Sequence, residues 1–254
     1  MDPNRSLPDR IRRLGWSAKD RFIDGLCSFG VISDPQTLKV SGVSADFRVT
    51  SSSERWRVQN AMGEREILEP LIEAIEESDC FWDVGAAVGT YSCLALEAGA
   101  TVVAFEPHPV NRKRCKENIR LNGYEPDVRD IALSDSSSIF KMAPDDGVGA
   151  GMYRLSSDGD ISVQAIRGDI VEAPDPQIIK IDVEGHEMEV LRGMDSRLKS
   201  VRLLLIECHP EFGVDTSEVE NYLQNHNFTT NRVNTERDDA IFVFATQNNS
   251  YNIN

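Results

Sequence analysis

The sequence predicts an α/β fold built on a doubly wound, mostly parallel sheet. From residue 80 onward, short apolar runs alternate with amphipathic helical segments, which is the pattern of strands joined by crossover helices. Hydrophobic residues make up 40% of the 254 residues, enough for a sizeable core. At this length one large domain is expected rather than two small ones. Two closely spaced strands end the pattern and predict an antiparallel edge strand.

The individual elements follow from apolar periodicity and glycine stops. Strands are expected over 80–84, 101–105, 127–133, 177–183, 201–207, 228–233 and 240–245. Helices are expected over 64–77, 89–100, 111–123, 187–193 and 215–226. Pro70 should disturb the first of these helices because proline donates no backbone hydrogen bond. The glycine-rich stretch 137–165 predicts small strands and a loop.

Residues 1–62 are predicted to form an extension ahead of a main domain over 63–247, with a polar tail over 248–254. The extension contains a predicted helix over 8–29 and a hairpin over 38–50. Residues 1–21 hold six basic and three acidic side chains, a net charge of +3. Three alternatives stay open for this helix: ordinary packing, a lid over the strand ends, or peripheral contact with an anionic membrane surface.

Composition and charge exclude several classes of protein. Asp and Glu number 42 against 27 Lys and Arg, for a net charge of -15, which argues against nucleic acid as a partner. No apolar run is long enough to span a membrane, and the N-terminus lacks an apolar signal core. Five scattered cysteines without a C-x-x-C pair indicate free thiols in the cytoplasm. The acidic excess fits either a halophilic surface or an ordinary acidic protein.

Polar residues follow five of the predicted strands. Because the carboxyl ends of parallel strands meet at one crevice, these residues are expected to converge on a ligand. The acids and histidines are Asp83, Glu106, His108, Asp130, Asp182, Glu184, His186, Glu207 and His209, and Gly85 and Ala132 lie beside them in the same loops.

The loop after the first strand indicates the cofactor. Its pattern, Gly85-x-Ala87-x-Gly89, is not the G-x-G-x-x-G of dinucleotide-binding folds. Asp83 just before it would repel a pyrophosphate but suits a cationic ligand such as a methionine ammonium or a sulfonium. Glu106 after the second strand is placed to accept both ribose hydroxyls. Together these features favour S-adenosylmethionine over NAD.

Several motifs in this order and spacing resemble the FkbM-type family of S-adenosylmethionine-dependent methyltransferases. They are FWDVGAAVGTYS, VVAFEPHPVNRKRCKENIRLNG, DIALSD, IIKIDVEGHEMEVLRGM and LLLIECHPE. Ala87 stands where that family usually has Asn. The resemblance implies a class I methyltransferase fold, which is Rossmann-like, and methylation of a hydroxyl on a sugar, a glycan or another small metabolite.

Site roles are assigned on this basis. The cofactor is expected to contact Asp83, Gly85, Ala87, Gly89, Ser92, Glu106, Asp130, Ala132 and Asp182, with Asp130 and Ala132 beside the adenine by resemblance. The catalytic candidates are Asp182, Glu184, His186 and His209, with His209 as the preferred general base. His108 is interpreted as a turn residue and His226 as structural.

Alternatives to O-methylation remain at this point. They are methylation of a uronic acid carboxyl, a non-catalytic protein that binds S-adenosylmethionine or a nucleotide, and, more weakly, an NAD-dependent enzyme. Asp182, Glu184, His186, Glu207 and His209 would also suit Mg²⁺ or Mn²⁺, although no required metal is expected. The sequence predicts neither the acceptor nor the oligomeric state.

Overall fold

The computed structural model describes residues 25, 34–51, 54–55, 58–59, 61, 64–144, 153–156, 159–233, 235 and 240–247. Apart from Gly25, the predicted helix over 8–29 lies outside these residues. The three alternatives for that helix, which are packing, a lid and membrane contact, therefore stay predictions. The predicted tail over 248–254 also lies outside them. Within the described part of the chain, no helix is both long and apolar enough to cross a bilayer.

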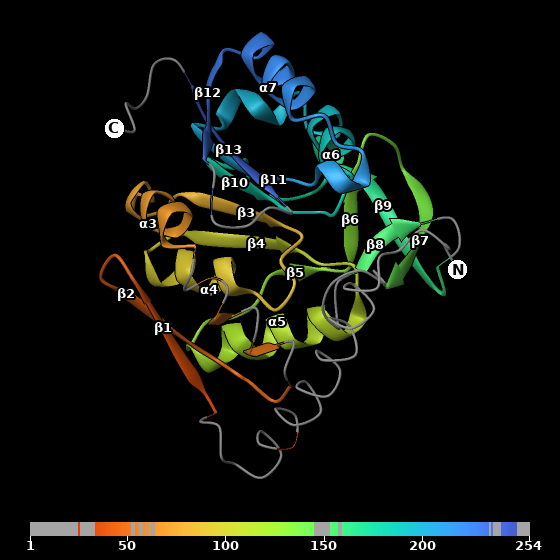
Figure 1. Cartoon of the computed structure of the whole chain (residues 1–254). Coiled ribbons are helices and arrows are strands. Elements are labelled where there is room, and N and C mark those ends of the chain that lie inside the picture. Colours follow the sequence, from red (N-terminus) through yellow and green to blue (C-terminus); the bar gives the residue numbers. More distant parts are fainter. Residues whose placement is uncertain are drawn as a thin grey trace, which may run out of the picture.

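A seven-stranded sheet forms the centre of the molecule, in the order β12-β13-β11-β10-β3-β4-β5 (Figure 1). Its strands are β3 (Cys80–Val84), β4 (Thr101–Phe105), β5 (Val128–Arg129), β10 (Ile178–Ile181), β11 (Leu203–Cys208), β12 (Phe228–Val233) and β13 (Ile241–Gln247). The chain builds outward from β3 to β5, then returns to the other side of β3 with β10 and β11, all parallel. The doubly wound prediction is confirmed. The topological switch point lies between β3 and β10.

The antiparallel part of the sheet differs in detail from the prediction. β13 is antiparallel to both β11 and β12, so it lies inside the sheet and β12 forms the edge. The close spacing of the last two strands therefore predicted their hairpin pairing but not which of them is outermost.

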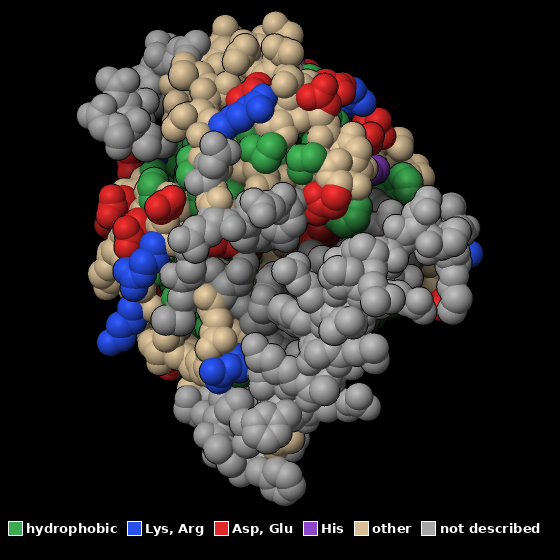
Figure 2. Space-filling view, viewed as in Figure 1, with side chains coloured by type: hydrophobic (Ala, Val, Ile, Leu, Met, Phe, Trp, Pro, Cys, Tyr) green, Lys and Arg blue, Asp and Glu red, His purple; other side chains and the backbone are tan. Residues whose placement is uncertain are grey.

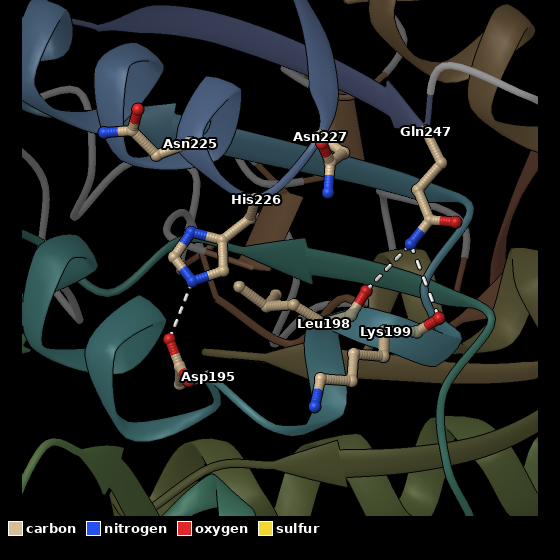
Figure 3. Close-up of a pocket in the computed structure, with 7 residues that line it drawn as sticks. All are labelled: Asp195, Leu198, Lys199, Asn225, His226, Asn227 and Gln247. Carbon is tan, nitrogen blue, oxygen red and sulfur yellow. Dashed lines mark hydrogen bonds and ion pairs between the residues drawn. The ribbon is translucent and has the colours of Figure 1, made fainter.

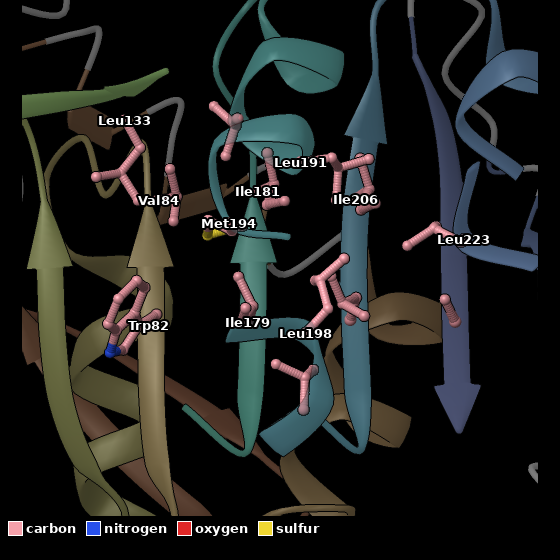
Figure 4. Close-up of a cluster of buried hydrophobic side chains, with 14 of the residues drawn as sticks. Trp82, Val84, Leu133, Ile179, Ile181, Leu191, Met194, Leu198, Ile206 and Leu223 are labelled. Atoms are coloured by element: carbon pink, nitrogen blue, oxygen red, sulfur yellow. The ribbon is translucent and has the colours of Figure 1, made fainter. Parts of the chain in front are cut away.

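Alternation along the strands divides the core between the two faces of the sheet. One face packs Trp82, Ile179, Ile181 and Ile206 against α6 (Glu187–Gly193), the short helix η2 (Arg197–Ser200) and α7 (Thr216–Asn225) (Figure 4). The other face is covered by α3 (Arg65–Glu73), α4 (Thr90–Glu97) and α5 (Pro109–Leu121). The result is a three-layer α/β/α arrangement with the strand ends left between the helix layers.

The predicted hairpin is present as β1 (Gln36–Val40) and β2 (Val43–Phe47), and it packs on the outer side of the helix layer formed by α4 and α5 (Figure 1). Asn118 of α5 is fully buried and joins two distant segments. Its side chain accepts the Arg48 N–H at 2.9 Å and donates to the Val88 carbonyl at 2.9 Å. The extension therefore braces the loop that follows β3.

A second, four-stranded sheet lies beside α6, in the order β6-β9-β7-β8. Its strands are β6 (Ile131–Ser134), β7 (Ser138–Pro144), β8 (Tyr153–Ser156) and β9 (Ile161–Arg167). The prediction of one strand over 127–133 was wrong, because the chain bends at Asp130 and β5 and β6 join different sheets. The small strands expected over 137–165 are confirmed.

The helices match the predicted ranges closely and differ mainly in their first and last residues. α3 continues through Pro70 but ends at Glu73, short of the predicted residue 77. α6 has the predicted bounds, and Asp215 caps α7 by accepting the Ser217 N–H at 2.8 Å. In the described part of the chain four cysteines are free and buried, namely Cys80, Cys93, Cys115 and Cys208.

Candidate active site

The loop after β3 passes directly over the end of β10. Gly85 has φ +79, and a Cβ built on it would lie 1.8 Å from the Asp182 carbonyl oxygen. Gly89 has φ +83 and precedes α4, where a Cβ would lie 2.8 Å from the Cys115 sulfur. Ala87 between them also has a positive φ, +50, a conformation that Asn adopts more readily than Ala. The glycines therefore stand where only a bare backbone fits.

Glu106 ties this loop to the one after β4. Its Oε2 accepts the Ala87 N–H at 2.7 Å, and its Oε1 accepts the His108 N–H at 2.8 Å. His108 in turn caps α5, with Nδ1 accepting the Asn111 N–H at 3.5 Å, in agreement with its interpretation as a turn residue. The carboxylate is thus held in place at the strand ends.

Asp130 and Ala132 lie next to this position. The Arg129 carbonyl accepts the Glu106 N–H at 3.1 Å, so the end of β5 adjoins the end of β4. Asp130 is exposed at the bend after β5, whereas Ala132 is buried in β6. Both predicted adenine neighbours therefore border the Glu106 loop.

A buried row of charges lies on one face of the central sheet. Lys180 is the register partner of Asp83, and its Nζ lies 3.1 Å from Asp182 Oδ2, 3.1 Å from the Gly85 carbonyl and 3.8 Å from Asp83 Oδ1. The ammonium also lies 5.0 Å from the centre of the Tyr91 ring. Sequence reasoning missed Lys180, although a lysine inside the apolar run IIKI was a visible signal.

Asp83 and Lys180 in this row shift each other's pKa. Burial raises the pKa of Asp83, while the Lys180 charge and a 2.6 Å hydrogen bond from the Ser92 hydroxyl oppose that rise. Burial would lower the pKa of Lys180, but the carboxylates of Asp182 and Asp83 outweigh it and raise the pKa. Asp83 is fully buried, so it faces Lys180 and Ser92 inside the protein.

Replacing Lys180 with methionine should lower the free energy of unfolding by about 3 kcal/mol, because two carboxylates lose their buried counter-charge. The double variant Lys180→Met with Asp83→Asn should recover part of this loss. Urea denaturation measures both. Lys113→Met is the control, since that side chain is 79% exposed and its loss should change little. A wild-type midpoint in Lys180→Met would show that the row contributes no stability.

A second cluster surrounds His209 at the end of β11. Its Nε2 lies 3.4 Å from Glu184 Oε2, 3.7 Å from Glu207 Oε1 and 3.8 Å from Asp182 Oδ1. Its Nδ1 lies 2.8 Å from Oε1 of Glu187, which is fully buried in the first turn of α6. Sequence reasoning missed Glu187, because an acid opening a helix is usually an exposed charge.

Several acids act on this one imidazole. Burial lowers the pKa of His209, but the hydrogen bond with Glu187 and the charges of Asp182, Glu184 and Glu207 outweigh it and raise the pKa to about 10. Gly185 has φ +97 and packs against Phe212, which turns the chain so that Glu184 and Glu187 both reach His209.

His186 has a different environment from His209. Its Nε2 lies 2.9 Å from the Ser134 hydroxyl of β6, its Nδ1 lies 3.6 Å from Glu189, and burial lowers its pKa. The structure therefore brings Asp182, Glu184 and His209 together but directs His186 toward the small sheet.

His226 lies at the opposite end of the central sheet, as expected. It borders a hollow of about 540 Å³ lined by Asp195, Leu198, Lys199, Asn225, His226, Asn227 and Gln247 (Figure 3). Its Nε2 is 2.7 Å from Asp195, and its Nδ1 is 2.8 Å from the Tyr222 carbonyl. The Gln247 N–H donates to the carbonyl of Arg202, just before β11 begins, so this hollow is distant from the strand carboxyl ends.

Comparison with known proteins identifies the family. A family model described as the methyltransferase FkbM domain matches residues 83–230, which is more than half of the chain. The chain belongs to this family. It is therefore a methyltransferase with S-adenosylmethionine as the methyl donor, and the resemblance inferred from its motifs is confirmed.

Individual relatives agree with this assignment. This FkbM-family chain is 36% identical over 224 residues to the hexuronic acid methyltransferase AglP of Haloferax volcanii, covering 86% of this chain and 92% of that protein. The crystal structure of methyltransferase FkbM from Methylobacillus flagellatus KT aligns with a TM-score of 0.50 at 17% identity, covering 76% of this chain and 52% of that one.

A third relative shares the fold alone. The magnesium protoporphyrin IX methyltransferase of Synechocystis PCC 6803, solved with bound S-adenosylmethionine, aligns with a TM-score of 0.50 at 12% identity, covering 77% of this chain and 84% of that one. The class I methyltransferase fold predicted for the FkbM-family chain is thereby confirmed.

Proposed function

We propose that this FkbM-family enzyme methylates an oxygen of a hexuronic acid unit in a glycan. The observation that carries the proposal is a juxtaposition at the switch point between β3 and β10. Glu106 fixes the loop that contains Gly85 on one side, and Asp182 and His209 lie on the other. The relative named as a hexuronic acid methyltransferase supports a sugar of this kind.

In this proposal the cofactor lies over the ends of β3 and β4. The backbone of the loop over 85–89 approaches it closely, and the Glu106 carboxylate accepts the ribose hydroxyls. Asp130 and Ala132 border the adenine. Asp83 and Ser92 act from beneath the loop, because both side chains are buried there with Lys180.

The acceptor lies over the ends of β10 and β11. Its oxygen attacks the methyl carbon in line as the bond from that carbon to sulfur breaks, and the enzyme supplies alignment. The proton passes to Asp182 or Glu184, whose side chains are 25% and 15% exposed, whereas that of His209 is 2% exposed. His209 supports these carboxylates from below. His186 faces Ser134 of the small sheet and is assigned no proton transfer.

A sugar hydroxyl is the favoured target atom, because the carboxylates around His209 would repel an acceptor carboxylate. Methyl ester formation on the uronate carboxyl is the second candidate, since the named relative acts on hexuronic acid. Mild alkali distinguishes the two products, because it hydrolyses a methyl ester and leaves a methyl ether intact.

Titration calorimetry with S-adenosylmethionine, followed by mass analysis of a hexuronic acid glycoside after incubation, tests the proposal. Binding and a methylated product are expected. Absence of cofactor binding at millimolar ligand would contradict the cofactor assignment. Binding without methylation of any hexuronic acid glycoside would contradict the acceptor assignment and favour a non-catalytic role.

His209→Gln should lower kcat at least about 100-fold and change the Kd for S-adenosylmethionine little, because His209 holds the carboxylates of Asp182 and Glu184 that are proposed to take the proton. Methyl transfer from labelled cofactor measures the first, and calorimetry the second. His226→Gln is the matched control, since His226 also pairs with a carboxylate but at the far end of the sheet. Equal kcat values in the two variants would remove His209 from the site.

We also propose a cytoplasmic protein with a surface adapted to high salt and without nucleic acid partners, on the basis of its net charge of -15. Acidic and basic side chains are interspersed on the face in Figure 2. The melting temperature should rise between about 0.1 M and about 1 M KCl, as the screening length falls from roughly 10 to 3 Å. A melting temperature that falls with added salt would contradict this adaptation.

A further inference from the structure

We propose that Asp182, Glu207 and His209 form a binding site for a hard divalent cation of the Mn²⁺ and Mg²⁺ class. Ligand atoms of the three residues lie within 4.8 Å of one another. Asp182 directly follows β10, Glu207 lies in β11 and His209 directly follows it, so adjacent parallel strands hold all three. Carboxylates with one imidazole suit such an ion. This inference goes beyond the sequence-based expectation of no required metal.

The imidazole has the orientation of a metal ligand. Oε1 of Glu187 lies 2.8 Å from His209 Nδ1 and accepts the Gly185 N–H at 3.1 Å. Because a carboxylate oxygen accepts, Nδ1 carries the proton in this pair. A metal-binding histidine usually donates its second ring nitrogen to a carboxylate, which directs the other nitrogen at the ion. Glu187 therefore positions Nε2 of His209 toward Asp182 and Glu207.

The second ring nitrogen is buried and has no hydrogen bond. Nε2 belongs to a side chain that is 2% exposed, and it has no hydrogen-bond partner among the described residues. The oxygens of Glu207 and Asp182 lie 3.7 and 3.8 Å away, beyond the roughly 3.2 Å limit of good N–H···O bonds. Two ligands that each lie roughly 2.1 Å from one ion are separated by at most about 4.2 Å. Both gaps therefore fit a shared cation.

The local negative charge also favours a divalent cation. The carboxylates of Asp182, Glu184, Glu187 and Glu207 all lie within 4 Å of this one imidazole, so negative charge accumulates in a buried volume. Lys180, 3.1 Å from Asp182, offsets part of it from one side. His209 becomes a neutral ligand when its Nε2 proton is released on metal binding, and a divalent cation would then offset the remaining negative charge.

The task of the cation toward the acceptor rests on the proposed function. An ion between β10 and β11 would bind the acceptor oxygen next to the methyl donor and lower the pKa of a hydroxyl, making it a better nucleophile. Glu184, beside the three ligands, would receive the proton.

Mn²⁺ binding to the full-length enzyme, followed by the electron paramagnetic resonance signal of free Mn²⁺ and without any acceptor, tests the site. One Mn²⁺ per chain is expected. Asp182→Asn, Glu207→Gln and His209→Gln should each weaken binding at least about 10-fold, and Glu187→Ala roughly 10-fold through loss of the positioning hydrogen bond. His226→Gln should bind as the wild type does, although it also removes a histidine–carboxylate pair.

The melting temperature of each variant shows whether it is folded. A variant that melts cooperatively near the wild-type temperature but has lost Mn²⁺ has lost the ion site alone, which supports the proposal. Absence of binding to the wild type at millimolar Mn²⁺ would overturn it, as would equal binding by the wild type and all folded ligand variants. Mn²⁺ binding in an enzyme that does not bind S-adenosylmethionine would refute the proposed function and leave the cation site standing.

Discussion

Replacing Gly85 with alanine is expected to destabilise the protein by roughly 5 kcal/mol and to abolish binding of S-adenosylmethionine. The new Cβ would lie 1.8 Å from the Asp182 carbonyl oxygen, a backbone atom that cannot move without displacing the end of β10. The positive φ of +79 adds a cost of about 1–2 kcal/mol for any L side chain. Thermal melts and cofactor titration measure the two effects.

Gly42→Ala and Gly123→Ala separate the clash from the backbone conformation. Both glycines have φ values like that of Gly85, +86 and +85, and a Cβ at either would meet nothing within 4 Å. Each control should lose only about 1–2 kcal/mol and bind the cofactor normally. A loss of unfolding free energy in Gly85→Ala no larger than in these controls would mean that the loop does not contact the end of β10 closely.

Glu106→Ala is expected to weaken S-adenosylmethionine binding about 100-fold or more. The substitution removes the acceptor for the Ala87 and His108 N–H groups, each a charge-assisted hydrogen bond worth about 1.5–3 kcal/mol. In the proposed site it also removes the ribose contact. Since about 1.4 kcal/mol corresponds to a tenfold change in affinity, the loss of charge-assisted hydrogen bonds to two ribose hydroxyls, each worth about 1.5–3 kcal/mol, accounts for the expected factor.

Titration calorimetry of Glu106→Ala, with Glu125→Ala as the control, checks this expectation. Glu125 is an exposed acid on the turn between α5 and β5, so its removal changes net charge equally and should leave affinity unchanged. Wild-type affinity in Glu106→Ala would place the cofactor elsewhere.

Much of the fold could be predicted because burial leaves a periodic record in the sequence. The runs over 80–84, 101–105 and 228–233 coincide with β3, β4 and β12, and the helix over 187–193 coincides with α6. The acids and histidines at the ends of the parallel strands β10 and β11 identified the cluster region, since parallel strands bring their carboxyl ends to one edge. Local composition determined these features.

The tertiary structure decided which of those residues meet. The chain bends at Asp130 because β5 pairs with β4 while β6 pairs with β9, and no local pattern shows which strand will be the partner. His186 and His209 follow neighbouring strands, yet they point to different partners because α6 turns one toward Ser134.

The buried charges also show what the sequence indicates and what only the tertiary structure decides. A lysine within IIKI predicts an unusual environment, but only the register of β3 with β10 places Lys180 opposite Asp83. Glu187 is an ordinary acid at the start of a helix until the end of β11 brings His209 within 2.8 Å of it. The sequence alone determined most of the strands, which of their ends carry acids and histidines, and the family. Packing between distant segments determined the ion pairs, because a side chain's partner depends on spatial neighbours that periodicity does not encode.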